Sequence, residues 1–493
     1  MLKHYIHCHQ AFDLKKGGSV GYISSLCEAF RRYNDSFLTD KKTKCSFLFP
    51  DIPTDQYIPN DILEIIVEQR FKYTQNYHIK TVSKNLLQKR QDWFREIIPF
   101  SEYVKIDPKN IASIHIHGAY NFLPIYNSLI RLGVDSRVVK ILTTHNPYQP
   151  TMEDMYLTCR NMKWRNDDKE MFYYYFNERD KWAFKLADCL FFPTEESLEG
   201  YYKLWPEFAS LIKNKPIYFC PTGTAINKPA DDKKFLKESL NIPKDAKIFL
   251  YLGRFIDVRG YDILIDAAKQ IISKNDKIYF IVVGEKHVVP INSKQWIQIP
   301  FTDKPQEYIN IADACLCPNR GSLFDLSMIE FLAFGKPIIC SYVGGYRWLE
   351  NKTSGVLYSS VEDIDKFADN ILLFSQFSRE KINKMQNDNL NLYKKCLSLN
   401  SFQENYCNTI DNIYRDFGIS KKMYSISYCD KASVFSLNAD NKKEFFTKGE
   451  PVIKSLEITK KVESKQEIFN RKFKKLIRNP YVFFKDFLIK RLG

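Results

Sequence analysis

The stretch FLYLGRFIDVRGYDILIDAAKQI, residues 249–271, decides the fold of this chain. It opens with an apolar run that is typical of a buried strand and that ends at Gly253. After a short loop, apolar residues recur every three or four positions from Ile263 to Ile271, as they do on the buried face of a helix. A strand joined to a helix by a short loop predicts a βα unit of a parallel sheet.

The same alternation of strand and helix patterns extends in both directions from this stretch. In the first half of the chain, strands are predicted at 4–9, 45–50, 113–118, 138–145, 189–194 and 217–222. In the second half, they are predicted at 249–253, 278–284, 296–299, 314–318, 337–341 and 355–358. A polar segment rich in Pro, Lys and Asp, 227–247, separates the two series. The chain is therefore predicted to contain two doubly wound α/β domains in tandem.

Composition places the chain among globular proteins. Its 493 residues are too many for one hydrophobic core, and 44% of them are hydrophobic against 27% charged. The 12 cysteines show neither the spacing of a zinc site nor that of a disulfide framework, so we expect reduced and mostly buried thiols. The N-terminus lacks the apolar core of a signal peptide, and no apolar run is long enough to cross a membrane. A cytoplasmic location is expected.

The formal net charge of +15 predicts an anionic partner, which could be nucleic acid, a membrane surface or a phosphorylated substrate. Eight Lys or Arg residues against one Asp lie within 469–493, FNRKFKKLIRNPYVFFKDFLIKRLG. A nucleic-acid binder would spread its basic residues over a folded face, so no nucleic-acid partner is expected. Pro480 divides the segment into two amphipathic pieces, which predict attachment to an anionic membrane surface. The alternative is a helix docked on the protein itself.

A second basic and aromatic segment, 60–106, either faces a substrate or forms a solvated helix pair. Loops at the carboxyl ends of strands bind ligands in open α/β sheets. The loop after 249–253 carries Arg254 and Arg259, whose guanidinium groups could converge on one diphosphate. In PNRGSLFDLSMIEFLAFGKPII, residues 318–339, a helix follows the next such loop, and its first N–H groups could hold phosphate.

These two loops occur in order with GGSVGYISSL (17–26), the His117-Gly118 turn, LTTH (142–145), ADCLFFPTEES (187–197), VGGYRW (343–348) and SGVLY (354–358). Together they resemble the retaining nucleotide-sugar glycosyltransferases of family 4, which have the GT-B fold of two facing Rossmann-like domains. The resemblance covers about residues 1–417. Beyond it, KLIRNPYVFFKDFL (475–488) is similar to the C-terminal ends of bacterial capsule and surface-polysaccharide enzymes.

The resemblance implies an acceptor-side domain at 1–226 and a nucleotide-sugar domain at 227–400. It also implies a helix at 401–417 that crosses back to the first domain, and a basic amphipathic extension at 418–493. The implied activity is transfer of a hexose from a UDP- or GDP-linked donor to a lipid-linked or surface-polysaccharide acceptor, such as capsule or lipopolysaccharide. The enzyme would be peripheral on the inner face of the cell membrane and would use neither a metal nor a cofactor.

The resemblance also implies the members of the donor site. They are Gly18, Arg254, Arg259, Asp325, Leu326, Ser327 and Glu330. The two arginines would grip the diphosphate, and Glu330 would bind the ribose. Gly18 would let backbone amides approach the same diphosphate, while the amides of residues 325–327 would contact the transferred sugar or its phosphate. His117 would face the reaction centre as a catalytic residue, and His115 and His145 would be structural.

One departure from the family pattern bears on activity. Ser322 stands eight residues before Glu330, where family members usually carry a second Glu that orients sugar hydroxyls. Asp325 likewise stands where a glycine is common. Either the donor sugar differs, or catalysis is weakened, which leaves a catalytically weak scaffold in a polysaccharide assembly complex as the alternative function. Epimerases and phosphorylases that share the fold are a further alternative.

Overall fold

The computed structural model describes residues 2–8, 18–33, 39–40, 45–48, 106, 108–159, 166–226, 229, 233–285 and 290–419. Nearly all of the two predicted basic segments, 60–106 and 418–493, lies outside these ranges. Within the described ranges, no helix combines the length and the apolar character that crossing a bilayer requires.

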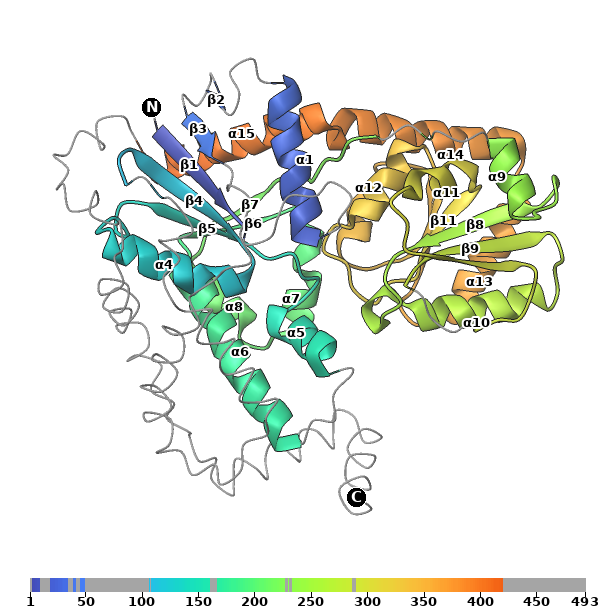
Figure 1. Ribbon diagram of the computed structural model, residues 1–493, viewed down its shortest axis with the longest axis horizontal. Coiled ribbons are helices and arrows are strands. Elements are labelled where there is room, and N and C mark those ends of the chain that lie inside the picture. The colour runs from blue at the N-terminus through green and yellow to red at the C-terminus, as the bar shows by residue number, and fades with distance from the viewer. Residues whose placement is uncertain are drawn as a thin grey trace. The chain divides into compact units, whose positions relative to one another are not determined.

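The first domain is built on a seven-stranded sheet in the order β2-β3-β1-β4-β5-β6-β7 (Figure 1). Its strands are β1 (Leu2–His7), β2 (Thr39–Asp40), β3 (Cys45–Leu48), β4 (Ile111–His117), β5 (Val139–Thr143), β6 (Cys189–Phe192) and β7 (Ile217–Phe219). All pair in parallel except β2, which is antiparallel to β3. The six strands predicted for this half are present, and β2 was not predicted because its two residues carry no apolar pattern.

The second domain contains a parallel six-stranded sheet in the order β10-β9-β8-β11-β12-β13. Its strands are β8 (Lys247–Leu252), β9 (Ile278–Gly284), β10 (Trp296–Pro300), β11 (Ala314–Cys317), β12 (Ile338–Ser341) and β13 (Val356–Ser359). Every residue of β9 is buried. Continuous burial of this kind is expected for parallel strands that helices cover on both faces. All six strands predicted for this half are present.

Helices cover both faces of each sheet (Figure 1). In the first domain they are α1 (Gly18–Tyr33), α4 (Phe122–Arg131), α5 (Pro150–Cys159), α6 (Asn166–Leu186), α7 (Glu199–Leu204) and α8 (Phe208–Ile212). In the second they are α9 (Lys233–Ser239), α10 (Tyr261–Ile272), α11 (Pro305–Ile311), α12 (Leu326–Ala333), α13 (Ile364–Ser375) and α14 (Arg379–Leu392). Helices α10 and α13 share one core with the second sheet, α11 and α12 share the other, and α14 contributes residues to both.

Helix α15 (Leu399–Asp416) follows the second domain in sequence but packs on the first, beside α1 (Figure 1). Its Tyr406 is buried, and the hydroxyl lies 2.9 Å from His4 Nε2 and 2.8 Å from His115 Nδ1. The chain leaves the first domain and returns to it at adjacent points, because Thr224 forms a bridge with Ser398. The polar segment that separates the two predicted series of strands, 227–247, contains α9.

None of the ten cysteines whose side chains are described forms a disulfide bond, and all of them except Cys396 are buried. This agrees with the prediction of reduced, mostly buried cysteines. The thiols fill core positions, where Cys behaves as a small apolar residue.

Candidate functional site

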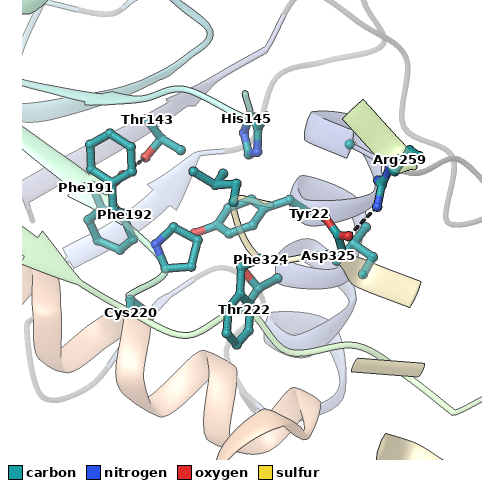
Figure 2. Close-up of a pocket in the computed structure, with 14 residues that line it drawn as sticks. Tyr22, Thr143, His145, Phe191, Phe192, Cys220, Thr222, Arg259, Phe324 and Asp325 are labelled. Carbon is teal, nitrogen blue, oxygen red and sulfur yellow. Dashed lines mark hydrogen bonds and ion pairs between the residues drawn. The ribbon is translucent and has the colours of Figure 1, made fainter. Parts of the chain in front are cut away.

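A pocket lies where the carboxyl ends of strands from both sheets meet (Figure 2). Its walls contain residues from α1, from the ends of β5 and β6, from the loops after β7 and β8, and from the start of α12. They are Gly18, Tyr22, Thr143, His145, Phe191, Phe192, Pro193, Cys220, Thr222, Arg259, Leu323, Phe324, Asp325 and Leu326. The empty space, including the open mouth, is about 560 Å³.

Four of the residues implicated by sequence line this pocket: Gly18, Arg259, Asp325 and Leu326. Gly18 and Leu326 are more than three hundred residues apart in sequence. These residues meet because both sheets direct their strand ends toward the same space. The other residues implicated by sequence do not line the pocket and are described below. They are Arg254, Ser327, Glu330, His117 and Ser322.

Gly18 is the first residue of α1 and has a φ of 67°. This left-handed conformation favours glycine. Among the described residues, a Cβ at this position would meet no heavy atom within 4 Å. A ligand could therefore approach the main chain closely at the start of α1.

Arg259 is held at the pocket by the turn that follows β8. The next residue, Gly260, has a φ of 63°, and a Cβ there would lie 1.8 Å from the carbonyl oxygen of Pro318. The loop can therefore pack against β11 only if residue 260 is glycine. The Arg259 side chain is 26% exposed and forms an ion pair with Asp325 (Figure 2).

Asp325 occupies the N-cap position of α12, but its side chain does not cap the helix. Its Oδ2 instead accepts hydrogen bonds from Asn319 Nδ2 at 3.0 Å and from the Tyr346 hydroxyl at 2.7 Å, as well as from Arg259. Because no side chain in the described part of the chain caps the helix, the first amides of α12, at Leu326 and Ser327, are available for an anion.

Arg254 is 46% exposed, and its Nη2 lies 3.0 Å from Oε1 of Glu153 in α5 of the first domain. The other Glu153 oxygen accepts a hydrogen bond from Asn146 Nδ2 at 2.7 Å. The two arginines of the β8 loop therefore diverge in this structure. Arg259 faces the start of α12, whereas Arg254 reaches across to the first domain.

Glu330 lies in α12, one turn after Leu326, and is partly buried. Its carboxylate has no hydrogen-bond partner among the residues that the structure describes. Removal from water raises the pKa of Glu330 to about 7. A carboxylate that is partly desolvated and unpaired is suited to accept hydrogen bonds from a ligand's hydroxyl groups.

The histidines are arranged differently from what the sequence suggested. His117 is fully buried behind the pocket, and His145 lines it. His117 Nδ1 lies 2.9 Å from His145 Nε2, and His117 Nε2 is buried with no partner among the described residues. Burial lowers the pKa of His145 to about 3 and that of His117 well below its usual range, so both rings are neutral at pH 7. The structure thus places His145, and not His117, at the pocket wall.

His115 is structural, as expected. Its Nδ1 bonds to the Tyr406 hydroxyl and its Nε2 lies 2.7 Å from Thr143 Oγ1. Both ring nitrogens are therefore satisfied inside the core.

Sequence reasoning missed Tyr22, whose ring projects into the middle of the pocket (Figure 2). Its hydroxyl is buried and has no partner among the described residues. The available signal was its spacing, because a residue four positions after Gly18 lies on the same face of α1. Glu153 was also missed, since nothing in its local sequence indicates that it faces Arg254.

Further contacts join the two domains beside the pocket. Ser197 Oγ donates to the Leu323 carbonyl at 2.6 Å, and Glu199 Oε2 accepts from the Gly344 amide at 2.6 Å. Ser322 lies beneath this contact, since its carbonyl oxygen accepts from the Gly345 amide at 3.1 Å. The Ser322 side chain is buried and its Oγ has no partner in the described part of the chain.

Residues 246–376, most of the second domain, match the family model described as glycosyl transferases group 1. This part of the chain is similar to group 1 glycosyl transferase domains. The pocket is therefore formed between the domain that contains the matched residues and the domain that precedes it. The β8 loop, with Arg254 and Arg259, and the start of α12 both lie within the matched residues.

Two curated relatives support this relationship at low identity. The chain is 24% identical over 289 residues to the lipopolysaccharide 1,2-N-acetylglucosaminetransferase of Salmonella typhimurium, a match that covers 54% of this chain and 64% of the relative. It is 28% identical over 158 residues to the O-antigen biosynthesis glycosyltransferase WclY of Escherichia coli, covering 30% of this chain and 42% of the relative. The matches thus span less than two thirds of either relative.

The whole architecture also matches a solved structure, sucrose-phosphate synthase from Thermosynechococcus elongatus. The superposition has a TM-score of 0.52 at 18% identity, and it covers 85% of this chain and 100% of that one. The predicted GT-B fold, two facing Rossmann-like domains followed by a helix, is confirmed.

Proposed function

We propose that the chain is a retaining glycosyltransferase that moves a hexose from a UDP- or GDP-linked donor to a lipid-linked or surface-polysaccharide acceptor. The observation that carries this proposal is the convergence of Gly18, Arg259 and the start of α12 on one pocket between the two domains. Each of the three offers N–H groups or positive charge to an anion, and together they suit a diphosphate.

The donor would lie along the second domain. Arg259 and the free amides at the start of α12 would bind the diphosphate, and Arg254 would reach it once released from Glu153. Glu330 would accept hydrogen bonds from the ribose, one turn further along α12. In this arrangement the positive charge comes from guanidinium groups and a helix N-terminus, so the proposal needs neither a metal nor a cofactor.

The chemistry proposed is substitution with retention. The acceptor hydroxyl attacks the anomeric carbon from the face that the diphosphate leaves, the bond between that carbon and the diphosphate oxygen breaks, and the leaving phosphate takes the hydroxyl proton. The protein positions the reactants and stabilises the charge that develops on the phosphate. His145, neutral at pH 7, would hydrogen-bond the reacting groups from the first domain, with His117 holding its ring in place.

The acceptor class rests on two supports. The first is that both curated relatives carry names of lipopolysaccharide or O-antigen synthesis. The second is the basic and aromatic segment 469–493, which would bring the enzyme to the inner face of the cell membrane, where lipid-linked acceptors are found. Under this proposal the enzyme is cytoplasmic and peripheral.

The test begins with the donor. Thermal shift against UDP, GDP and a panel of their hexose and N-acetylhexosamine conjugates identifies the nucleotide and the sugar. Mass analysis of products on lipid-linked acceptors then identifies transfer, and the anomeric coupling constant in the product reports retention. An inverted product would contradict the mechanism, and failure of every nucleotide to stabilise the protein would contradict the proposal as a whole.

One set of observations favours a second function, a GT-B scaffold with weak or no catalysis. Both arginines of the β8 loop pair with carboxylates, Glu153 and Asp325, and Ser322 supplies no carboxylate to the pocket. The discriminating measurement is slow donor hydrolysis without an acceptor. A glycosyltransferase would release the nucleoside diphosphate, whereas a scaffold would bind the donor, if at all, without consuming it.

A further inference from the structure

The carboxylate of Asp325 makes an unusual set of contacts. An aspartate at an N-cap position ordinarily accepts hydrogen bonds from the amides of the first turn. Here the side chain makes no such bond, and it is turned toward Arg259, Asn319 and Tyr346. All three donate to the same oxygen, Oδ2.

The second oxygen, Oδ1, has no partner among the residues that the structure describes. Asp325 lines the pocket, where it lies next to Arg259 (Figure 2). The residue is 9% exposed, so Oδ1 has little access to water except through the pocket. Three donors on Oδ2 hold the carboxylate in one orientation, and a polar group held in this way is preorganised for a ligand.

The chemistry of an ionised carboxylate selects the ligand group that can occupy this position. A phosphate oxygen would be repelled by it, whereas a hydroxyl group donates a hydrogen bond to it. The pocket thus has two polar zones: Arg259 and the α12 amides suit an anion, and Asp325 Oδ1 suits one or two hydroxyls beside that anion. A sugar joined to a diphosphate carries both groups in the required order.

We infer that Asp325 Oδ1 accepts hydrogen bonds from hydroxyls of the transferred sugar and thereby sets which sugar the enzyme uses. This inference rests on the proposed function. Ser322 does not supply such a contact, because it is 2% exposed and does not line the pocket, and its Oγ is buried with no partner in the described ranges. The carboxylate that orients the sugar in this chain is therefore the one at the start of α12.

A simpler role for Asp325 is to neutralise Arg259, and this role predicts a different result. If Asp325 were only a counterion, its removal would leave Arg259 free for phosphate. Binding of a nucleoside diphosphate and of its sugar conjugate would then strengthen by the same factor. If Asp325 holds the sugar, its removal weakens the conjugate relative to the free diphosphate.

The experiment compares Asp325→Asn and Asp325→Ala with wild type in the full chain, by calorimetric titration with UDP, GDP and the sugar conjugates of each. Asp266→Asn is the matched control, because Asp266 is an exposed acid on α10 that pairs with Lys269 away from the pocket. We expect the ratio of conjugate affinity to diphosphate affinity to fall about tenfold or more in both Asp325 variants. The control should keep the wild-type ratio.

The variants' own diphosphate binding reports whether the loop is still folded. If a variant binds neither UDP nor GDP while wild type binds one of them, the ratio is read from the other variant. If both variants fail in this way, conjugates lacking one sugar hydroxyl are titrated against wild type. An affinity about tenfold lower for at least one deoxy-sugar conjugate than for the complete conjugate supports the inference. Equal affinity for all the deoxy-sugar conjugates and the complete conjugate overturns it.

The experiment distinguishes failure of the Asp325 inference from failure of the proposed function. An unchanged affinity ratio in variants that still bind the diphosphate overturns the role of Asp325 and leaves the proposed function standing. Absence of any nucleotide binding by wild type overturns the proposed function, and the role of Asp325 with it.

Discussion

Nη2 of Arg254, in the second domain, lies 3.0 Å from Oε1 of Glu153 in the first. The pair joins the two domains beside the pocket and occupies one of the two guanidinium groups assigned to the donor diphosphate. A diphosphate and Glu153 therefore compete for Arg254. Because the Arg254 side chain is 46% exposed, the ion pair itself contributes at most about 1 kcal/mol, which a doubly charged ligand can overcome.

Competition at this pair predicts opposite effects for its two members. Glu153→Gln should strengthen binding of the nucleoside diphosphate by a few fold, since about 1 kcal/mol of competing interaction is removed. Arg254→Ala should weaken it by roughly tenfold or more, because a charge-assisted hydrogen bond is lost. Calorimetric titration measures both affinities. Equal affinity in the two variants and wild type would exclude Arg254 from the phosphate site.

Arg259 is predicted to matter more than Arg254, because it lines the pocket next to the free amides of α12. Arg259→Ala should lower turnover by about 10²-fold, corresponding to roughly 3 kcal/mol of transition-state stabilisation. Arg259→Lys should retain an intermediate rate, since it keeps the charge but loses the planar fork of donors. Lys269→Ala, on the exposed side of α10, is the control. Alanine and lysine variants that are equally active would contradict the assignment.

We predict that Glu330 binds the ribose but, when it is ionised, lowers the stability of the folded chain. Its folded-state pKa of about 7 exceeds its usual 4.5, so the unfolded chain releases this proton at lower pH than the folded one. The contribution of Glu330 to stability therefore falls as pH rises from 4.5 to 7, by on the order of 1–3 kcal/mol. Glu330→Gln should melt at a higher temperature than wild type near pH 8 and at a similar temperature near pH 4.5.

The same variant tests the ribose contact. Wild type should bind the ribonucleotide donor more tightly than its 2′-deoxy analogue, and Glu330→Gln should lose most of this preference. A variant that is more stable at pH 8 but still discriminates against the deoxy donor would show that another residue holds the ribose.

The histidines of the first domain predict a loss of stability in mild acid. Burial lowers the pKa of His4 and of His145 to about 3, and those of His115 and His117 well below 6.5. The unfolded chain takes up protons below about 6.5 while the folded chain does not, so this stabilisation is complete above 6.5 and is lost as pH falls toward 3. Each histidine changes the free energy of unfolding by up to about 1.4 kcal/mol per pH unit.

Urea unfolding at a series of pH values from about 7.5 to about 5 measures this slope. His145→Gln should reduce the slope by the contribution of about one proton, because one histidine that titrates only in the unfolded chain is removed. The substitution should have little effect on the core, since His145 lies at the pocket wall. Glu330 acts in the opposite direction, but one carboxylate is outweighed by four histidines. An unfolding free energy that does not fall over this range would contradict the neutral state of the histidines.

The segment 469–493 predicts binding to anionic lipid. The cut that tests it should follow Ile419, because Ile419 packs against the first-domain core and its amide bonds to the Tyr414 carbonyl at 2.8 Å. The truncated chain should no longer sediment with phosphatidylglycerol vesicles but should bind the donor as before. Salt should weaken attachment of the full chain. Equal sedimentation of both chains would place the membrane contact elsewhere, and 60–106 would then be the segment to test.

Local patterns were sufficient for the architecture. The apolar runs at 249–253 and 278–284 are buried strands, and the periodicity of 261–271 is that of α10, because burial of one helix face or of a whole strand depends on residues a few positions apart. That the loop with Arg259 and the start of α12 lie near the pocket could also be predicted, since strand ends in parallel sheets share one edge. The place of Gly18 was implied only by the family resemblance.

Tertiary structure alone decided which charged and polar groups meet. Glu153 and Arg254 are 101 residues apart, and Asp325 and Arg259 are 66 apart, so no local period relates them. It also decided that His145 faces the pocket and His117 stands behind it. His117 is the last residue of β4, inside the sheet, whereas His145 lies two residues beyond β5, where the chain has left the sheet. Hydrophobic periodicity shows which residues are buried, but ion pairs and pocket walls depend on distances that exist only after the two domains have packed together.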